Sequence, residues 1–125
     1  LLSTTACRFR LSSVEPLEVT PRLVGLLASE RRLCSHLHLP LQSGSDTVLA
    51  RMNRGYTARR YLELVEMIRA GLTRAAITTD ILVGFPGESE EDFADTLAVM
   101  ETVGFDDAFM YYYNPREGTP AFAMP

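Results

Sequence analysis

The chain has 125 residues, a net charge of −4 and only two cysteines. This length allows one small domain, and the acidic balance argues against a free-standing nucleic-acid-binding protein. No stretch approaches the roughly 20 apolar residues of a membrane span, and the first residues have no signal-peptide pattern. Because Cys7 and Cys34 lie far apart and match no metal-ligand spacing, we expect two reduced thiols in a cytoplasmic protein.

Four predicted strands follow one another along the chain. They span residues 7–14, 36–41, 76–85 and 108–114. The first three alternate apolar and polar side chains with a period of two. In the second strand the leucines share one parity, whereas His36, His38 and Gln42 share the other. Each of these strands therefore has one apolar side and one polar side.

Predicted helices separate the strands, and each begins after a residue that can cap it. These caps are Thr20, Ser45 or Asp46, Thr57 and Ser89. We expect the first helix to bury Leu23, Leu26 and Leu27, and the last to bury Phe93, Leu97 and Met100 before it stops at Gly104. The longest helix carries an apolar stripe from Tyr61 to Leu72, with Gly71 near its end.

Strands that alternate with helices predict a parallel sheet. Two α/β architectures fit: a doubly wound sheet or part of a parallel β/α barrel of the TIM type. A doubly wound sheet buries both faces under helices and has continuous apolar strands, so the polar sides favour the barrel, with a lumen that holds a ligand. About four strands are too few to close such a barrel.

Ligands bind at the carboxyl ends of the strands in both architectures. The four predicted ends offer carboxylates, an amide, hydroxyls, exposed backbone and aromatic rings. Such a set suits a nucleoside, a polar ligand with a flat ring. Structural roles remain open for each end: residues 84–87 could form only a tight turn, and Asp80 could pair with Arg10 across the lumen.

Four long, irregular motifs resemble one known family. They are SSVEP, RLCSHLHLPLQSGSDTVLARMNRGYT, TTDILVGFPGESEEDF and YNPREGTPA. In this order and spacing they closely resemble the radical S-adenosylmethionine tRNA methylthiotransferases of the MiaB and MtaB types. Members of that family add a 2-methylthio group to an N6-modified adenosine beside the anticodon, using S-adenosylmethionine and [4Fe–4S] clusters.

The resemblance implies that residues 1–125 form the C-terminal part of a radical SAM core domain, the latter part of a six-stranded barrel. The family's Cys-x-x-x-Cys-x-x-Cys cluster loop does not occur here. We therefore expect no metal ligand or catalytic residue in this chain, and a fragment that is inactive alone. The resemblance assigns S-adenosylmethionine binding to these residues: Glu15, Gln42, Ser43, Arg54, Asp80, Gly84, Phe85, Tyr113 and Asn114.

Several points stay open at this stage. The motifs do not separate the isopentenyl-adenosine branch of the family from the threonylcarbamoyl-adenosine branch. A barrel metallohydrolase using His36, His38 and Asp80 is a rival reading, although a zinc site normally needs further ligands. A non-catalytic RNA-binding module is another, based on the cluster Arg51, Arg54, Arg59 and Arg60. Because an incomplete barrel exposes a sheet edge, we also expect the fragment to self-associate.

Overall fold

The computed structural model describes residues 6–124 and has the expected α/β class. Its elements are η1 (Pro16–Glu18), α1 (Pro21–Ser29), β1 (His36–His38), α2 (Asp46–Arg51), α3 (Ala58–Gly71), β2 (Ala76–Val83), α4 (Glu90–Val103), β3 (Asp107–Tyr112) and η2 (Pro120–Ala123). Among the described residues, no helix has both the length and the apolar character needed to cross a membrane.

The sheet has three strands in the order β1-β2-β3, and both pairs are parallel. Leu37 pairs with Ile77, and Asp80 pairs with Phe109. Helices α2 and α3 connect β1 to β2, and α4 connects β2 to β3. This is the alternation of a β/α barrel that stops before it closes, which confirms the predicted architecture.

The strand predicted at residues 7–14 is wrong as a regular strand. The segment runs beside β1 and forms only two isolated parallel bridges, Phe9 with Leu33 and Ser13 with His38. The two bridges differ by one residue in register, so a single continuous ladder cannot include both. The segment nevertheless lies where a barrel strand would lie, on the far side of β1 from β2.

The second strand is shorter than predicted, because β1 ends at His38 instead of Leu41. Pro40 has no N–H to donate to a ladder, and Gln42 has a φ of 68°, which breaks the extended conformation. Pairing with β2 resumes at one isolated bridge between Gln42 and Ile81. The leucines still alternate as predicted, and Leu37, Leu39 and Leu41 are fully buried.

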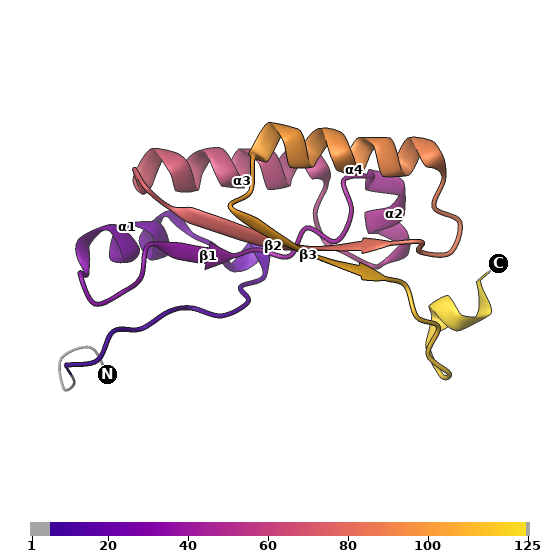
Figure 1. Cartoon of the computed structure of the whole chain (residues 1–125), viewed down its shortest axis with the longest axis horizontal. Coiled ribbons are helices and arrows are strands. Elements are labelled where there is room, and N and C mark those ends of the chain that lie inside the picture. Colours follow the sequence, from indigo (N-terminus) through magenta and orange to yellow (C-terminus); the bar gives the residue numbers. More distant parts are fainter. Residues whose placement is uncertain (1–5, 125) are drawn as a thin grey trace.

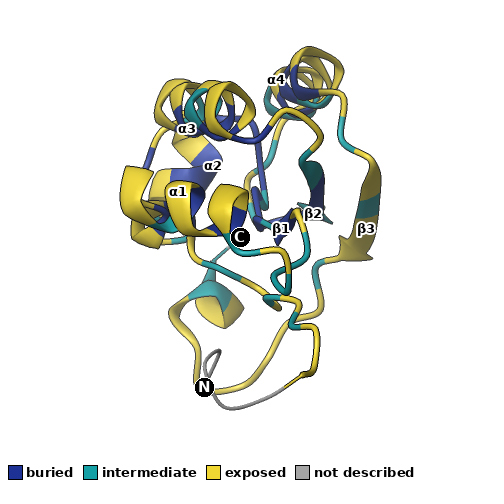
Figure 2. Cartoon of the chain, turned by 90° about the vertical axis from the view of Figure 1, so that its left-hand side faces the viewer, coloured by how far each residue is buried: buried dark blue, intermediate teal, exposed yellow. Residues whose placement is uncertain are grey.

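Figure 1 shows α3 and α4 on one side of the sheet, with the N-terminal segment and η2 on the other. The core lies between the helices and the sheet, where Ile77 and Ile81 of β2 face Tyr61 and Ile68 of α3 in one buried cluster. Figure 2 shows that burial is concentrated around β1 and β2, whereas β3 is largely exposed. The opposite side of the sheet is left open by the helices.

All four predicted helix caps are confirmed, with Ser45 capping α2. The side chains of Thr20, Ser45, Thr57 and Ser89 each accept a hydrogen bond from a first-turn N–H. Ser89 and Asp92 also form a reciprocal capping box. Gly104 ends α4 in the left-handed conformation, with a φ of 57°.

Two predicted helix faces need correction. Helix α1 buries Val24 and Leu27, whereas Leu26 is exposed. Helix α4 buries Thr96, Val99 and Val103, whereas the predicted Leu97 is exposed and Phe93 and Met100 are only partly buried. The reason in α4 is the loop at residues 42–45, because Gly44 packs directly on Thr96 and turns that side of the helix inward. Helix α3 buries its stripe as predicted.

Candidate functional site

The open face of the sheet carries a cavity of about 500 Å³. Its lining is Arg10, Leu11, Ser12, Ser13, His36, His38, Thr78, Asp80, Asp107, Phe109 and Tyr111. Strand alternation selects the lining residues of β1, β2 and β3, because every second side chain of these strands points away from the helices, whereas residues 10–13 come from the N-terminal segment. The cavity has the size of a small-molecule site and combines aromatic rings with charged and polar groups. The predicted polar lumen is therefore present.

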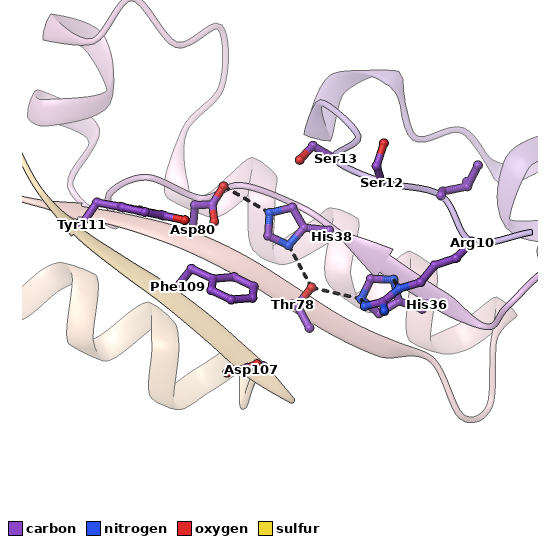
Figure 3. A pocket seen from close by; sticks show the side chains of 11 residues that line it. Arg10, Ser12, Ser13, His36, His38, Thr78, Asp80, Asp107, Phe109 and Tyr111 are labelled. Carbon is purple, nitrogen blue, oxygen red and sulfur yellow. Dashed lines mark hydrogen bonds and ion pairs between the residues drawn. The ribbon is translucent and has the colours of Figure 1, made fainter.

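A chain of polar side chains crosses the floor of this cavity (Figure 3). The Nε of Arg10 donates to Nδ1 of His36 at 3.1 Å. Nε2 of His36 lies 3.1 Å from Oγ1 of Thr78, which lies 2.9 Å from Nδ1 of His38. Nε2 of His38 is 3.1 Å from Oδ2 of Asp80. Arg10 therefore contacts His36, and the expected alternative pair of Arg10 with Asp80 does not form.

His36 is held in its neutral form by its surroundings. Burial lowers the pKa of His36, and the charges of Arg10 and His38 lower it further, whereas Asp106 acts in the opposite direction. The cost of burying a charged imidazole beside a guanidinium outweighs the attraction between that charge and the carboxylate of Asp106. At neutral pH the ring of His36 can thus donate from one nitrogen and accept at the other.

The carboxyl edge of the sheet holds two further hollows, each of about 500–600 Å³. Gln42, Arg54 and Phe85 line the first, and Tyr113 and Asn114 line the second. The two hollows share Leu82, Thr119 and Ala121, and the second shares Tyr111 with the cavity of the open face. The three spaces therefore lie next to one another, the second hollow between the first hollow and the cavity.

Gln42 is fixed by its backbone in an uncommon conformation. Its N–H donates to the carbonyl of Asp80 at 2.8 Å, and its own carbonyl accepts from Leu82 N–H at 2.9 Å. A positive φ is unusual for a residue other than glycine, and here it turns the Gln42 side chain toward the hollow. The hydroxyl of Tyr56 anchors the approach by donating to the Pro40 and Leu41 carbonyls, and burial raises the pKa of Tyr56 to about 12.

Ser43 and Gly44 point to the helix side of the sheet. Ser43 is fully buried, with its hydroxyl 3.3 Å from Oγ1 of Thr96 and accepting from Ser45 N–H. Gly44 N–H donates to Oγ1 of Thr96 at 2.9 Å. A Cβ on Gly44 would lie 2.5 Å from the Cα of Thr96, so only glycine fits. In the sequence QSGS, Gln42 thus lines the hollow, whereas Ser43 and Gly44 bind the loop to α4 through Thr96.

Glu15 and Arg54 meet at the same edge, although 39 residues separate them in sequence. Nη1 of Arg54 lies 2.9 Å from Oε1 of Glu15, and their side chains are 27% and 53% exposed. Because both groups keep solvent contact, the pair adds little to stability. It leaves the other carboxylate oxygen of Glu15 and the other guanidinium N–H groups for a ligand.

The remaining predicted residues lie at the ends of β2 and β3. Gly84 has a φ of 77°, and its N–H donates to the carboxylate of Glu88. The Phe85 ring packs edge-on against Tyr113, with centroids 5.3 Å apart. The Tyr113 hydroxyl is buried without a hydrogen-bond partner among the described residues. A buried hydroxyl of this kind, at the edge of a hollow, can form a hydrogen bond with a bound ligand.

Sequence reasoning missed the side chains that support Asp80. The polar parity of His36 and His38 was visible in the sequence, but it indicated only a lumen or a zinc site. Within residues 6–124, no group of three or more metal-ligating side chains is placed to hold a metal ion. The imidazole nitrogens are instead engaged with Arg10, Thr78 and Asp80, which removes the basis of the metallohydrolase reading.

The arginine cluster does not form a free cationic surface. Arg51 donates to the Gly87 carbonyl at 2.7 Å, and Arg54 pairs with Glu15. Arg59 and Arg60 both pair with Glu63. Since each of these arginines has an acceptor within the chain, the cluster by itself gives weak support to an RNA-binding module.

The family profile described as "Radical SAM superfamily" matches residues 4–100. A tRNA-2-methylthio-N(6)-dimethylallyladenosine synthase from Treponema pallidum (strain Nichols) is 52% identical over 116 residues, which cover 93% of this chain and 25% of the relative. The synthase of the same name from Carboxydothermus hydrogenoformans is 50% identical over 117 residues, covering 94% and 27%. The chain thus spans about a quarter of the length of the curated relatives it matches.

Among solved structures, a similar chain belongs to the work titled "Coproporphyrinogen III oxidase (HemN) from Escherichia coli is a Radical SAM enzyme". The TM-score is 0.70 at 22% sequence identity, and the match covers 92% of this chain and 25% of the other. At this identity the likeness concerns the fold alone. It agrees with a partial parallel β/α barrel.

Proposed function

Because this chain belongs to the radical SAM superfamily, we propose that it is the latter part of the barrel of a longer tRNA methylthiotransferase. In this role, residues 1–125 belong to the core domain and bind S-adenosylmethionine. Support comes from relatives that are about half identical over nearly the whole chain and are named tRNA-2-methylthio-N(6)-dimethylallyladenosine synthases. A tRNA-modifying enzyme of this kind would act in the cytoplasm.

The convergence of the strand ends carries the proposal. Glu15 follows the N-terminal segment, Gln42 follows β1, Phe85 follows β2 and Asn114 follows β3. All four segments run parallel, so their ends meet at one edge of the sheet. The hollows at this edge share lining residues, and one of them shares Tyr111 with the polar lumen. Cofactors bind at this edge in parallel α/β folds.

The residues at this edge fit the parts of S-adenosylmethionine. Its methionyl tail carries an ammonium and a carboxylate, and the Glu15–Arg54 pair offers one group of each opposite charge. Gln42 and Asn114 provide amides for ribose hydroxyls, and Phe85, which lines the first hollow, can border the adenine together with the preceding backbone of Gly84. Ser43 has its hydroxyl engaged with Thr96, so we leave it out of the binding set.

Bound S-adenosylmethionine would supply a sulfonium whose carbon–sulfur bond can be broken reductively. The residues of this chain would bind and orient it, since the bond must point in one direction for reaction. Glu15 and Arg54 would hold the tail, and Phe85 would border the ring.

The residues present do not fit a [4Fe–4S] cluster. Such clusters take cysteine thiolates as ligands, and this chain has only Cys7 and Cys34, 27 positions apart in sequence. The chain alone should therefore transfer no methylthio group. The cluster loop of the proposed enzyme, a Cys-x-x-x-Cys-x-x-Cys segment, would lie on polypeptide that precedes these residues.

For the substrate, we propose the dimethylallyl (isopentenyl) adenosine of tRNA instead of the threonylcarbamoyl adenosine. The curated relatives at 46–52% identity carry the dimethylallyl name.

The sequence upstream of Leu1 in the same reading frame provides a direct check of the proposed enzyme class. A three-cysteine loop roughly a hundred residues before Leu1, the length of two βα units and their loops, is expected. An uninterrupted frame without such a loop would contradict the proposal.

Ligand binding tests the cradle itself. Binding of S-adenosylhomocysteine and of 5′-methylthioadenosine, which lacks the amino-acid tail, is measured by calorimetry with the full-length protein. Arg54→Ala should weaken S-adenosylhomocysteine binding about tenfold or more, because a charge-assisted hydrogen bond contributes roughly 1.5–3 kcal/mol. Methylthioadenosine binding should change little. Arg59→Ala, which removes an exposed arginine paired with Glu63, is the matched control.

We also propose that the chain associates with itself when isolated. Within the described residues, β3 pairs only with β2, so its other edge is free. Met110 and Tyr112 on this strand are 69% and 88% exposed, and an unpaired apolar edge promotes pairing between copies. Light scattering should find dimers or larger species, reduced in Tyr112→Lys but not in the control Leu26→Lys on α1. A monodisperse wild-type monomer would contradict this.

A further inference from the structure

The polar chain on the cavity floor has one consistent arrangement of hydrogens when each ring carries a single N–H. The Asp80 carboxylate can only accept, so His38 donates from Nε2. Nδ1 of His38 then accepts from the Thr78 hydroxyl. The Thr78 oxygen in turn accepts from Nε2 of His36. The order of donors and acceptors is thus set from the carboxylate end.

The Nε contact of Arg10 at the other end of the chain agrees with this arrangement. Arg10 can only donate, so Nδ1 of His36 accepts from Nε of Arg10 and the hydrogen of His36 lies on Nε2. The neutral state of His36 agrees with its lowered pKa. The second contact, Nη2 of Arg10 with Nε2 of His36 at 2.9 Å, joins two donors in this arrangement, so we count only the Nε contact as a hydrogen bond.

Only one carboxylate oxygen of Asp80 takes part in these hydrogen bonds. Oδ2 accepts from His38, whereas Oδ1 has no hydrogen-bond partner among the described residues. Asp80 lines the cavity with Phe109 and Tyr111, and Figure 3 shows its carboxylate between His38 and the ring of Tyr111. Its backbone carbonyl also accepts from Gln42 N–H at 2.8 Å. Asp80 therefore connects the cavity floor to the edge hollow.

We propose that His38 is a positioning residue, which holds one carboxylate oxygen of Asp80 so that the other accepts a hydrogen bond from the nucleoside part of bound S-adenosylmethionine. Thr78, His36 and Arg10 fix the ring of His38 in turn. A carboxylate held by a single hydrogen bond at the wrong angle would rotate freely, whereas a supported one presents a fixed acceptor. This inference rests on the proposed function and adds a role for side chains outside the edge hollows.

The histidine tautomers test the arrangement without any ligand. This chain contains only two histidines, so in the full-length protein the variants His36→Gln and His38→Gln identify their ring signals in two-bond proton–nitrogen correlation spectra. At pH 7.5 both rings should carry the hydrogen on Nε2 and accept at Nδ1, and the pattern should vanish in urea. A hydrogen on Nδ1 of His38, or a mixture of tautomers like that in urea, overturns the inference and leaves the proposed function untouched.

Binding of S-adenosylhomocysteine tests the consequence. Compared with wild type, His38→Leu should bind about tenfold more weakly, the loss of one well-oriented hydrogen bond. His38→Gln keeps an N–H donor near the position of Nε2 and should stay within about threefold of wild type. Ser35→Ala, an exposed polar residue just before His36 and outside the cavity, serves as the matched control.

A double-mutant cycle separates positioning from general damage. If His38 acts through Asp80, His38→Leu should have no further effect in the Asp80→Ala background. Equal weakening in both backgrounds, or no effect of His38→Leu in wild type, overturns the inference even if both variants fold. Failure of the wild-type protein to bind S-adenosylhomocysteine contradicts the proposed function, and the inference that rests on it fails with it.

Discussion

The two faces of the sheet differ sharply, although the same strands form both. On the helix side, Leu37, Leu39 and Ile77 are fully buried beneath α3 and its neighbours. On the open side, His36, Thr78 and Asp80 line a cavity and are linked by hydrogen bonds through His38. Neighbouring residues of one strand thus belong to different environments, one buried under helices and one open to a cavity.

This difference separates stability from function within each strand. Apolar burial on the helix side supplies most of the favourable free energy of folding. The open side contributes charged and polar groups that gain little from folding but present fixed donors and acceptors. Substitutions on the two sides should therefore have separable effects, and the following predictions test this from the largest effect to the smallest.

Adjacent residues of β2 give the largest contrast. Ile81 is 1% exposed in the core, and Leu82 beside it lines the edge hollows. Ile81→Ala should lower the free energy of unfolding by about 2–5 kcal/mol, through lost burial and the cavity it leaves. Leu82→Ala should cost about 1 kcal/mol or less. Urea unfolding followed by circular dichroism measures both, and equal losses would show that the two faces are not distinct.

Substitution of Gly44, in the loop at residues 42–45, should have the next largest effect on the free energy of unfolding. Gly44→Ala places a Cβ against the backbone of Thr96 and Asp95, so the loop must lift from α4 at a cost of roughly 1–3 kcal/mol. Gly25→Ala is the control, since its Cβ would meet no atom within 4 Å. That change lies inside α1 and should stabilise by about 0.5–1 kcal/mol. Thermal unfolding should shift in opposite directions for the two variants.

The pH dependence of stability should report the open face. Burial, with the charges of Arg10 and His38, lowers the pKa of His36 below its ordinary 6.5 in the folded state. Well above pH 6.5, His36 is neutral in both the folded and the unfolded state. As the pH falls below that value, the unfolded state binds the proton first, so stability falls until the folded pKa is reached. His36→Gln should flatten this dependence in urea unfolding between pH 7.5 and 5.

That pH range also excludes Asp92, a carboxylate whose pKa is lowered in the folded state. Hydrogen bonds from Ser45 and Ser89 lower the pKa of Asp92 below 3.8, so its contribution is lost only in stronger acid. A wild-type slope that persists unchanged in His36→Gln would assign the effect to other groups. It would also argue against a neutral His36 on the cavity floor.

The edge ion pair should have the smallest effect on stability. Glu15→Gln removes the charge of a half-exposed partner of Arg54, and such pairs contribute about 0–1 kcal/mol. The unfolding midpoint should change little at low or high salt, whereas S-adenosylhomocysteine binding should weaken. A large loss of stability without a loss of binding would show that Glu15 has a structural role and does not bind the ligand.

Local chemistry explains what the sequence predicted well. Thr57 and Ser89 cap helices because their hydroxyls reach N–H groups three residues away. The stripe of α3 needed only helical periodicity. The buried face of α4 was missed because the contact of Thr96 with Gly44 joins residues 52 positions apart. No periodicity within α4 could indicate it.

The candidate site shows the same limit. Alternation placed Gln42, Asp80 and the histidines on the polar side of the strands, and parallel pairing brought the strand ends together, as predicted. The neighbours of each group could not be predicted, because isolated bridges shift the register of the N-terminal segment and of the loop after β1 by one residue. A shift of that size changes which side chains face one another.

The amino-acid sequence alone determined the class of fold, the polar inner side of the strands, the helix caps and the likeness to radical SAM methylthiotransferases. These follow from the period-two geometry of extended backbone, from short-range hydrogen bonds and from long motifs. Only the tertiary structure decided that His38 supports Asp80, that Arg10 contacts His36 and that Ser43 faces α4. Such pairings depend on the register between distant segments, which is set by the packing of the whole sheet.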